Sequence, residues 1–322
     1  MKILVCGSGV IGSLLIHTLV GVNNDVSVLA RNQRSKELKE NGLRIKISNK
    51  KNIYTDQVTV VEAIPQDIHY DMIFSVMQYS QQFDLLEDLA KANTEIIILV
   101  GNNISSKEMK ETILSHSTNN KTVLFGFQGT GGTKEKDYTE VLSVGKADMV
   151  IGEVDKEVDE NTKQLIERAF DKKTYELKWM DHMDAWYKCH LAFVIPCCYL
   201  AYAVHCDLKK TTSEERKLLL DASNQVFEAL KSLGCPIRPV NEDTYYKPGM
   251  KRLILVAMMY VLAKTKYGDI ALTNHCKHAV NEMKILATKL EELIYSSKVD
   301  LSKYKELKAL SPSWDDLEKE WN

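Results

Sequence analysis

Residues 2–20 read KILVCGSGVIGSLLIHTLV, and this stretch decides the fold. It starts as a strand-like apolar run, passes through Gly7-Ser-Gly9-Val-Ile-Gly12 and continues as a helix-like segment. A GxGxxG pattern alone is weak evidence, because glycine triplets also occur in tight turns that hold no ligand. Between a strand and a helix, however, the pattern is typical of a dinucleotide-binding turn.

Each glycine of this turn has a separate task. Gly7 permits the sharp turn, Gly9 lets the backbone approach a pyrophosphate, and Gly12 lets the helix pack closely on the strand. The free N–H groups and the dipole at the start of the helix then face the phosphates. The expected cofactor loop therefore comprises Gly7, Ser8, Gly9, Val10, Ile11 and Gly12.

The end of the second strand indicates which dinucleotide binds. An NAD site usually places a carboxylate there for the ribose 2′-hydroxyl. This strand instead ends in Ala30-Arg31, with Arg34 and Lys36 close behind. A guanidinium can bind a 2′-phosphate through two hydrogen bonds, so Arg31 favours NADP(H); the alternative is a solvated loop arginine.

The first half of the chain alternates strand-like and helix-like segments, and the second half is helix-compatible almost throughout. Such alternation predicts parallel strands joined by right-handed crossovers. We therefore expect an α/β protein, with an N-terminal Rossmann doubly wound sheet followed by a mainly α-helical domain. The expected division is residues 1–170 for NADP(H) binding and residues 171–322 for the substrate.

Composition excludes several classes of function. The 42 basic and 44 acidic residues of the 322-residue chain leave a net charge of -2, which is not typical of a nucleic-acid-binding protein. The sequence contains neither a CxxC nor an HExxH pattern, either of which would indicate a metal site. The apolar residues 191–206 are shorter than the about 20 residues of a membrane span, and Pro196 interrupts them. With no secretory signal pattern at its start, the sequence predicts a cytoplasmic protein.

Further fragments extend the interpretation beyond the glycine-rich turn. They are, in chain order, LAR (29–31), SVMQYSQ (75–81), LVGNN (99–103), FGFQGTGG (125–132) and AWYKCHLAFVIP (185–196). With the N-terminal stretch, their order and spacing resemble the ketopantoate reductase family, within the superfamily of 6-phosphogluconate dehydrogenase-like enzymes. FGFQGTGG reads equally well as a ligand-binding loop and as a flexible interdomain connector, whereas Lys134-Glu-Lys136 beyond it reads as solvated surface.

The resemblance implies roles for three residues. Asn102 matches an asparagine beside the nicotinamide ribose, and Gln78 stands where the family commonly has a cofactor-contacting lysine. Lys188 matches the catalytic lysine, which protonates the alkoxide that develops as hydride reaches the keto carbon.

The chain departs from the family where the substrate binds. Two substrate-holding asparagines are replaced by Ala192 and Pro196, and the stretch that carries the family's glutamate has no carboxylate before Glu282. A replacement set would include His190 beside Lys188, and also His275, His278 and Glu282. We expect His278 and Glu282, four residues apart, to share one helix face; the alternatives are a packed interface histidine at 190 and a solvated face at 278 and 282.

The resemblance implies an NADP-dependent oxidoreductase acting on CH-OH or keto groups, with a 2-keto acid or related small carbonyl compound as substrate. Its default reaction is that of 2-dehydropantoate 2-reductase, in pantothenate biosynthesis. The alternatives are a non-catalytic NADP(H)-binding sensor, favoured by the altered substrate positions, and an opine- or imine-type dehydrogenase of the same superfamily. The resemblance is compatible with a monomer or a homodimer.

Overall fold

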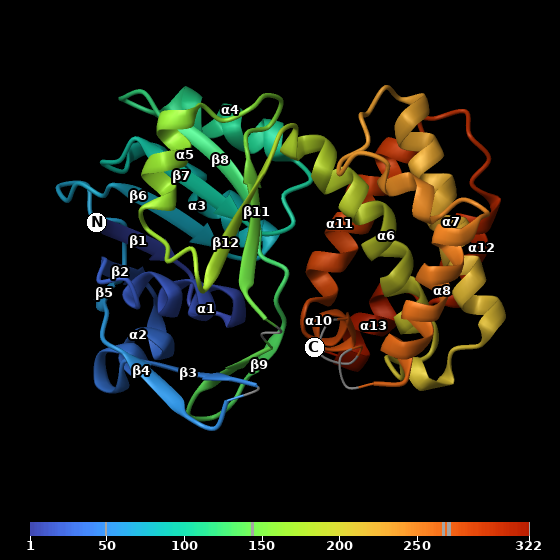
Figure 1. The fold of residues 1–322 in the computed structure, drawn as a ribbon, viewed down its shortest axis with the longest axis horizontal. Coiled ribbons are helices and arrows are strands. Elements are labelled where there is room, and N and C mark those ends of the chain that lie inside the picture. The colour runs from blue at the N-terminus through green and yellow to red at the C-terminus, as the bar shows by residue number, and fades with distance from the viewer. Residues whose placement is uncertain (49, 143–144, 266–267, 269–271, 322) are drawn as a thin grey trace. The chain divides into compact units, whose positions relative to one another are not determined.

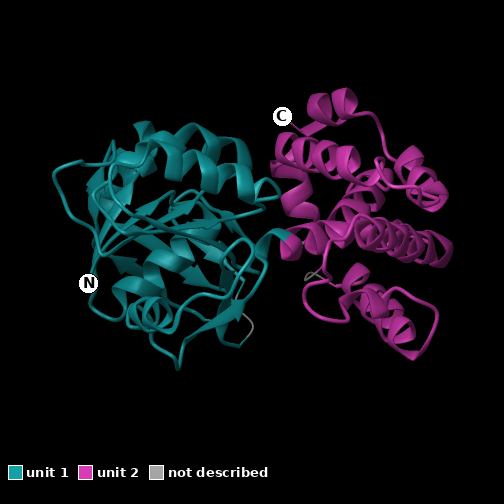
Figure 2. Ribbon diagram, turned by 90° about the horizontal axis from the view of Figure 1, so that it is seen from above, with its two compact units in different colours: residues 1–184 teal, residues 185–322 magenta. Residues whose placement is uncertain are grey.

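The structure, a computed structural model, describes residues 1–48, 50–142, 145–265, 268 and 272–321. The chain divides into two compact units, Met1–Asp184 and Ala185–Asn322 (Figure 2). The expected division after residue 170 lies earlier, because β12 (Tyr175–Met180) pairs in parallel with β11 (Ala147–Gly152) and so belongs to the sheet of the first unit.

An eight-stranded sheet forms the centre of the first unit, in the order β12-β11-β8-β7-β6-β1-β2-β5 (Figure 1). Its other strands are β1 (Lys2–Cys6), β2 (Asp25–Leu29), β5 (Thr59–Val61), β6 (Met72–Val76), β7 (Ile96–Val100) and β8 (Thr122–Phe127). These six strands run parallel, and β11 joins β8 in antiparallel orientation. The expected Rossmann-type sheet is confirmed.

Every residue of β6 and β7 is buried, as expected for parallel strands covered on both faces. The helices of this unit are α1 (Val10–Val20), α2 (Asn32–Asn41), α3 (Tyr79–Lys91), α4 (Ser106–His116) and α5 (Glu160–Glu167). Leu15 and Ile16 of α1 and Ile166 of α5 share one apolar core with the central strands. This core fixes the strand ends at which the loops of the first unit begin.

A second, four-stranded sheet lies beside α1. Its order is β4 (Ile53–Asp56), β3 (Leu43–Ile47), β10 (Thr139–Val141) and β9 (Gly132–Lys134). Lys134, expected in a solvated surface stretch, is exposed, but it is the last residue of β9 and has an ion-pair partner described below. Pairing of β9 with β10, which in turn pairs with the distant β3, places it there.

The second unit is helical, as expected. Its helices are α6 (Met183–Ala203, which begins just before the division), α7 (Ser213–Ser232), α8 (Met250–Ala263), α10 (Asn274–His278), α11 (Val280–Ile294), α12 (Ser302–Leu310) and α13 (Trp314–Trp321). Helix α7 begins with a capping box, in which the Thr212 hydroxyl accepts from the N–H of Glu215 and the Glu215 carboxylate accepts from the N–H of Thr212. Among the described residues, no helix is both long enough and apolar enough to cross a membrane.

Candidate functional site

The glycine-rich turn joins β1 to α1, and its glycines differ in what surrounds them. Gly7 has φ +104°, and a Cβ built on it would lie 2.2 Å from the carbonyl oxygen of Val76. A Cβ on Gly12 would lie 2.2 Å from the carbonyl oxygen of Gly7, whereas one on Gly9 has no atom within 4 Å. Gly7 and Gly12 are therefore required by the turn itself, and Gly9 borders open space into which a ligand can come close to the backbone.

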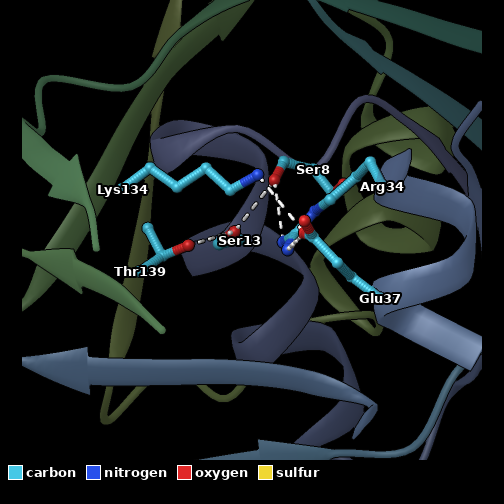
Figure 3. A network of polar contacts seen from close by, with 6 residues as sticks. All are labelled: Ser8, Ser13, Arg34, Glu37, Lys134 and Thr139. Carbon is cyan, nitrogen blue, oxygen red and sulfur yellow. Dashed lines mark hydrogen bonds and ion pairs between the residues drawn. The ribbon is translucent and has the colours of Figure 1, made fainter. Parts of the chain in front are cut away.

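A network of charged groups lies against this turn (Figure 3). Arg34 of α2 donates from Nε to the Ser8 hydroxyl at 3.0 Å and from Nη2 to the Ser8 carbonyl oxygen at 3.1 Å. Its Nη1 also contacts Glu37 Oε2 at 3.2 Å, and Lys134 Nζ contacts the same oxygen at 3.3 Å. Two cations thus converge on one carboxylate beside the loop.

The carboxylate of Glu37 is held in its charged form. Burial raises its pKa, but the hydrogen bonds and charges of Arg34 and Lys134 act in the opposite direction, and the net pKa lies below its usual value. A phosphate, which is also an anion with several acceptor oxygens, can bind the same two cations.

Arg31 occupies the residue before α2 and is exposed. Its Nε donates to the carbonyl oxygen of Glu62 at 3.4 Å, a long hydrogen bond, and its two terminal nitrogens have no hydrogen bond to another described residue. Of the two arginines that follow β2, Arg34 contacts the glycine-rich turn. Arg31 lies in the connection between β2 and α2.

Asn102 and Gln78 follow β7 and β6 at the carboxyl edge of the sheet. The side-chain oxygen Oδ1 of Asn102 is buried and has no hydrogen-bond partner among the described residues, as expected of a group that awaits a ligand. Gln78 is exposed and immediately precedes α3. Gln82 was not predicted from the sequence. Its buried Nε2 donates to the carbonyl oxygens of Met77 at 3.2 Å and Val100 at 3.0 Å, and so links the ends of β6 and β7.

The glycine-dense segment 126–132 is fixed to the glycine-rich turn. The buried Gln128 donates from Nε2 to the carbonyl oxygen of Ile11 at 3.3 Å and accepts at Oε1 from the Tyr175 hydroxyl at 2.5 Å. Thr130 donates its hydroxyl to the carbonyl oxygen of Leu142 at 2.6 Å. Of the two interpretations left open, these bonds favour an ordered loop at the carboxyl edge of the sheet over a flexible connector.

Lys188 and His190 both lie in α6 of the second unit. Because side chains two residues apart on a helix do not face each other, they do not form a pair on one face. His190 instead stacks on Trp186, one turn earlier, with ring centroids 4.9 Å apart and an interplanar angle of 11°. Desolvation, with a smaller contribution from the charge of His275, lowers the pKa of His190 to about 4, so the ring is neutral at neutral pH.

The expected single helix through His278 and Glu282 is wrong. Ala279, with φ -138° and ψ 36°, separates α10 from α11, so the two residues do not share one helix face. Glu282 is buried and pairs with His275, whose Nε2 lies 3.8 Å from Glu282 Oε2, whereas His278 is exposed. Within the described residues, no cluster of three or more His, Cys, Asp or Glu side chains could hold a metal ion.

Comparison with known proteins places this geometry in context. Residues 3–156 match the family model described as Ketopantoate reductase PanE/ApbA. A search of the curated proteins finds no match. The resemblance inferred from the quoted motifs is therefore confirmed, with the sequence match lying in the N-terminal part of the chain.

Solved structures extend the likeness in fold to the whole chain. A 2-dehydropantoate 2-reductase from Methylococcus capsulatus is 18% identical, with a TM-score of 0.69, 100% of this chain covered and 98% of that chain. One from Geobacter metallireducens GS-15 is 15% identical, with a TM-score of 0.72 and coverage of 99% and 100%. A D-mandelate dehydrogenase with NADH and anilino(oxo)acetate is 13% identical, with a TM-score of 0.69 and full coverage of both chains. At these identities the likeness shows a shared fold.

Proposed function

Because residues 3–156 match the ketopantoate reductase family and the whole chain shares the fold of its solved structures, we propose that this protein is an NADPH-dependent reductase of a 2-keto acid or a related small carbonyl compound. The observation that carries the proposal is the glycine-rich turn with Arg34 bound to Ser8 and open space at Gly9.

The residues of the first unit fit a nicotinamide dinucleotide in three respects. The turn from Gly7 to Gly12 offers the backbone N–H groups of a helix start to a pyrophosphate. Arg31, Arg34 and Lys134 would bind the 2′-phosphate, with Glu37 as the counter-ion that the phosphate displaces. The orphaned Oδ1 of Asn102 would accept a hydrogen bond from the nicotinamide ribose.

Reduction of a carbonyl group needs a hydride at carbon and a proton at oxygen. The cofactor, when bound, supplies the hydride. Lys188 donates the proton from its ammonium group to the carbonyl oxygen as negative charge develops there, and it regains a proton from water afterwards. Before the transfer, the same ammonium stabilises the developing oxyanion. On the same helix, the neutral ring of His190 stacks on Trp186.

The default substrate is 2-dehydropantoate, reduced to pantoate for pantothenate biosynthesis in the cytoplasm. Ala192 and Pro196, in place of the family's asparagines, weaken this choice and widen the proposal to other small 2-keto acids. Glu282, buried beside His275, is the acidic group that could take over substrate positioning. Exposed His278 remains a weaker candidate.

Two alternatives have specific support. The D-mandelate dehydrogenases of the same fold contain NADH, which favours a hydroxy-acid dehydrogenase with the other cofactor. The altered substrate positions favour a sensor that binds NADP(H) without turnover.

Calorimetric titration with NADPH and with NADH tests the cofactor assignment. We expect selective binding of NADPH, and Arg34→Gln should weaken it by roughly 10- to 100-fold, since hydrogen bonds to charged groups contribute about 1.5–3 kcal/mol. Lys136→Gln, two residues beyond Lys134, is the matched control and should leave the affinity unchanged. Equal affinity for both cofactors would refute the assignment of NADP.

Turnover assays then separate the functions. Ketopantoate and other 2-keto acids, alone and with amines, are supplied to the wild-type protein and to Lys188→Ala. We expect keto-acid reduction that is lost in the variant although NADPH still binds. Activity only with amines would indicate an imine dehydrogenase, and NADPH binding without any turnover would indicate a sensor.

A further inference from the structure

One cysteine of the chain differs from the others in its exposure. Six of the seven cysteines are buried, whereas Cys235 is partly exposed. It lies in the turn that follows α7, after Gly234, whose φ of +77° reverses the chain. The N–H of Cys235 donates to the carbonyl oxygen of Leu230 at 3.0 Å. The end of the helix therefore holds Cys235 at a defined place where a reagent in solution can reach its thiol.

A second thiol lies against that of Cys235. Cys189 of α6 and Cys235 both donate to the carbonyl oxygen of Pro236, at 3.9 Å and 3.7 Å respectively. The two thiols are also hydrogen-bonded to each other. A disulfide requires two cysteines whose Cβ atoms already lie close together, because its S–S bond is only about 2.05 Å long. Two thiols that contact each other and share one carbonyl oxygen are close to this geometry.

The surroundings of Cys189 change when Cys235 is oxidised. The hydrogen bond with Cys235 is the largest cause that raises the pKa of Cys189, and burial raises this pKa further. The backbone N–H of Arg238, which donates to Cys189 Sγ at 3.4 Å, lowers it. Once Cys235 has been oxidised it no longer ionises, so the first of these causes disappears. Cys189 is therefore a protonated thiol in the reduced protein and ionises more readily after Cys235 has reacted.

We propose that Cys189 and Cys235 form a reversible disulfide by exchange with a small disulfide such as oxidised glutathione. The Cys235 thiolate attacks one sulfur of the small disulfide, whose S–S bond breaks and releases one thiolate. Cys189 then loses its proton to water and attacks Cys235 Sγ, which breaks the mixed disulfide and releases the second thiolate. The two protein thiols lose two electrons and two protons in total, and the small disulfide becomes two thiols.

The disulfide would act on the residue proposed to donate the proton. Cys189 directly follows Lys188 in α6, and the disulfide connects this helix to the turn after α7. Because the two sulfurs must approach from a hydrogen-bond contact to about 2.05 Å, the helix or the turn must move. A displacement of about 1 Å can lower the rate of a reaction by about 100-fold. Oxidation should therefore slow the reduction; this consequence rests on the proposed function, whereas formation of the disulfide does not.

Peptide mapping of the full chain by mass spectrometry, after incubation with oxidised glutathione, tests the disulfide. We expect a cross-linked peptide pair that contains Cys189 and Cys235 and that dithiothreitol separates. Cys235→Ser should give no such pair, and Cys189→Ser should stop at the mixed disulfide, with one glutathione on Cys235. Circular dichroism shows that each variant is folded. A wild type without the Cys189–Cys235 pair would overturn the proposal.

The chain contains its own control pair. The sulfurs of Cys198 and Cys276 lie 3.5 Å apart, but both residues are buried, with exposed fractions of 1% and 0%. They should stay reduced under the same conditions, because the small disulfide cannot reach them. Oxidation of both pairs to the same extent would show that the reagent acts on unfolded chains, and it would also overturn the proposal.

Turnover before and after oxidation tests the effect on Lys188. The wild type and Cys235→Ser are assayed with NADPH and 2-keto acids. We expect oxidation to lower the rate of the wild type by at least about 10-fold, dithiothreitol to restore it, and Cys235→Ser to keep its rate throughout. A cross-linked wild type with an unchanged rate would refute this effect. If the reduced protein turns over no keto acid, the proposed function fails, while the peptide map still decides whether the disulfide forms.

Discussion

The environment of His190 predicts how the stability of the second unit depends on pH. Its pKa is lowered from 6.5 to about 4 in the folded chain. Between these values the unfolded chain binds a proton that the folded chain does not, so stability rises with pH. The contribution is fully present above pH 6.5 and is lost as the pH falls to about 4. The difference corresponds to at most ~3.5 kcal/mol, since one pKa unit is about 1.4 kcal/mol.

Replacement of the titrating ring isolates this contribution. His190→Phe keeps an aromatic ring against Trp186 and removes the ionisable group. Urea unfolding, followed by tryptophan fluorescence at several pH values between 4 and 6.5, should show a shallower loss of stability in the variant than in the wild type. The exposed His278→Asn is the matched control and should behave like the wild type. Parallel stability curves for the wild type and His190→Phe would refute the reasoning.

Four further predictions follow from local geometry. Gly12→Ala should lower thermal stability, with a cost of roughly 1–3 kcal/mol or more, because its Cβ meets the Gly7 carbonyl oxygen at 2.2 Å. Gly9→Ala should fold normally and bind NADPH more weakly in calorimetry; unchanged affinity would show that no ligand approaches there. Glu37→Gln should tighten NADPH binding by about 3- to 10-fold and leave NADH unaffected, since Arg34 and Lys134 lose a competing anion; an equal effect on both cofactors would contradict this. Thr212→Ala should lower the free energy of unfolding by about 1 kcal/mol through loss of the α7 cap, whereas Thr288→Ala on an exposed helix face should change it less.

Sequence reasoning predicted those parts of the molecule that depend on local patterns. The turn from Gly7 to Gly12 lies in one short stretch, and its strand and helix follow from periodicity. Lys134 could not be placed in this way, because its position depends on the pairing of β9 with β10 and of β10 with β3, which is far away in the sequence.

The helical unit shows a second limit. The break at Ala279 has neither glycine nor proline to mark it, so residues 277–297 read as one continuous helix. The pairing of His275 with Glu282 follows from that break and was therefore missed. The exposure of apolar residues on α8 was also hidden, since an apolar run reads equally well as buried core.

The small sheet beside α1 has a consequence for the order in which the first unit is completed during synthesis. Strands β1 and β2 and the turn between them can form soon after they leave the ribosome, since a domain folds from the segments already made. Strand β10 pairs with β3 through Thr139 and Ile45, and it also brings its Thr139 hydroxyl to Ser13 of α1. A nascent chain that ends before β9 therefore carries the glycine-rich turn but lacks Lys134. With Lys134 as one of the groups proposed to bind the 2′-phosphate, the growing first unit completes the site that discriminates between the two nicotinamide cofactors only after β9 has been made.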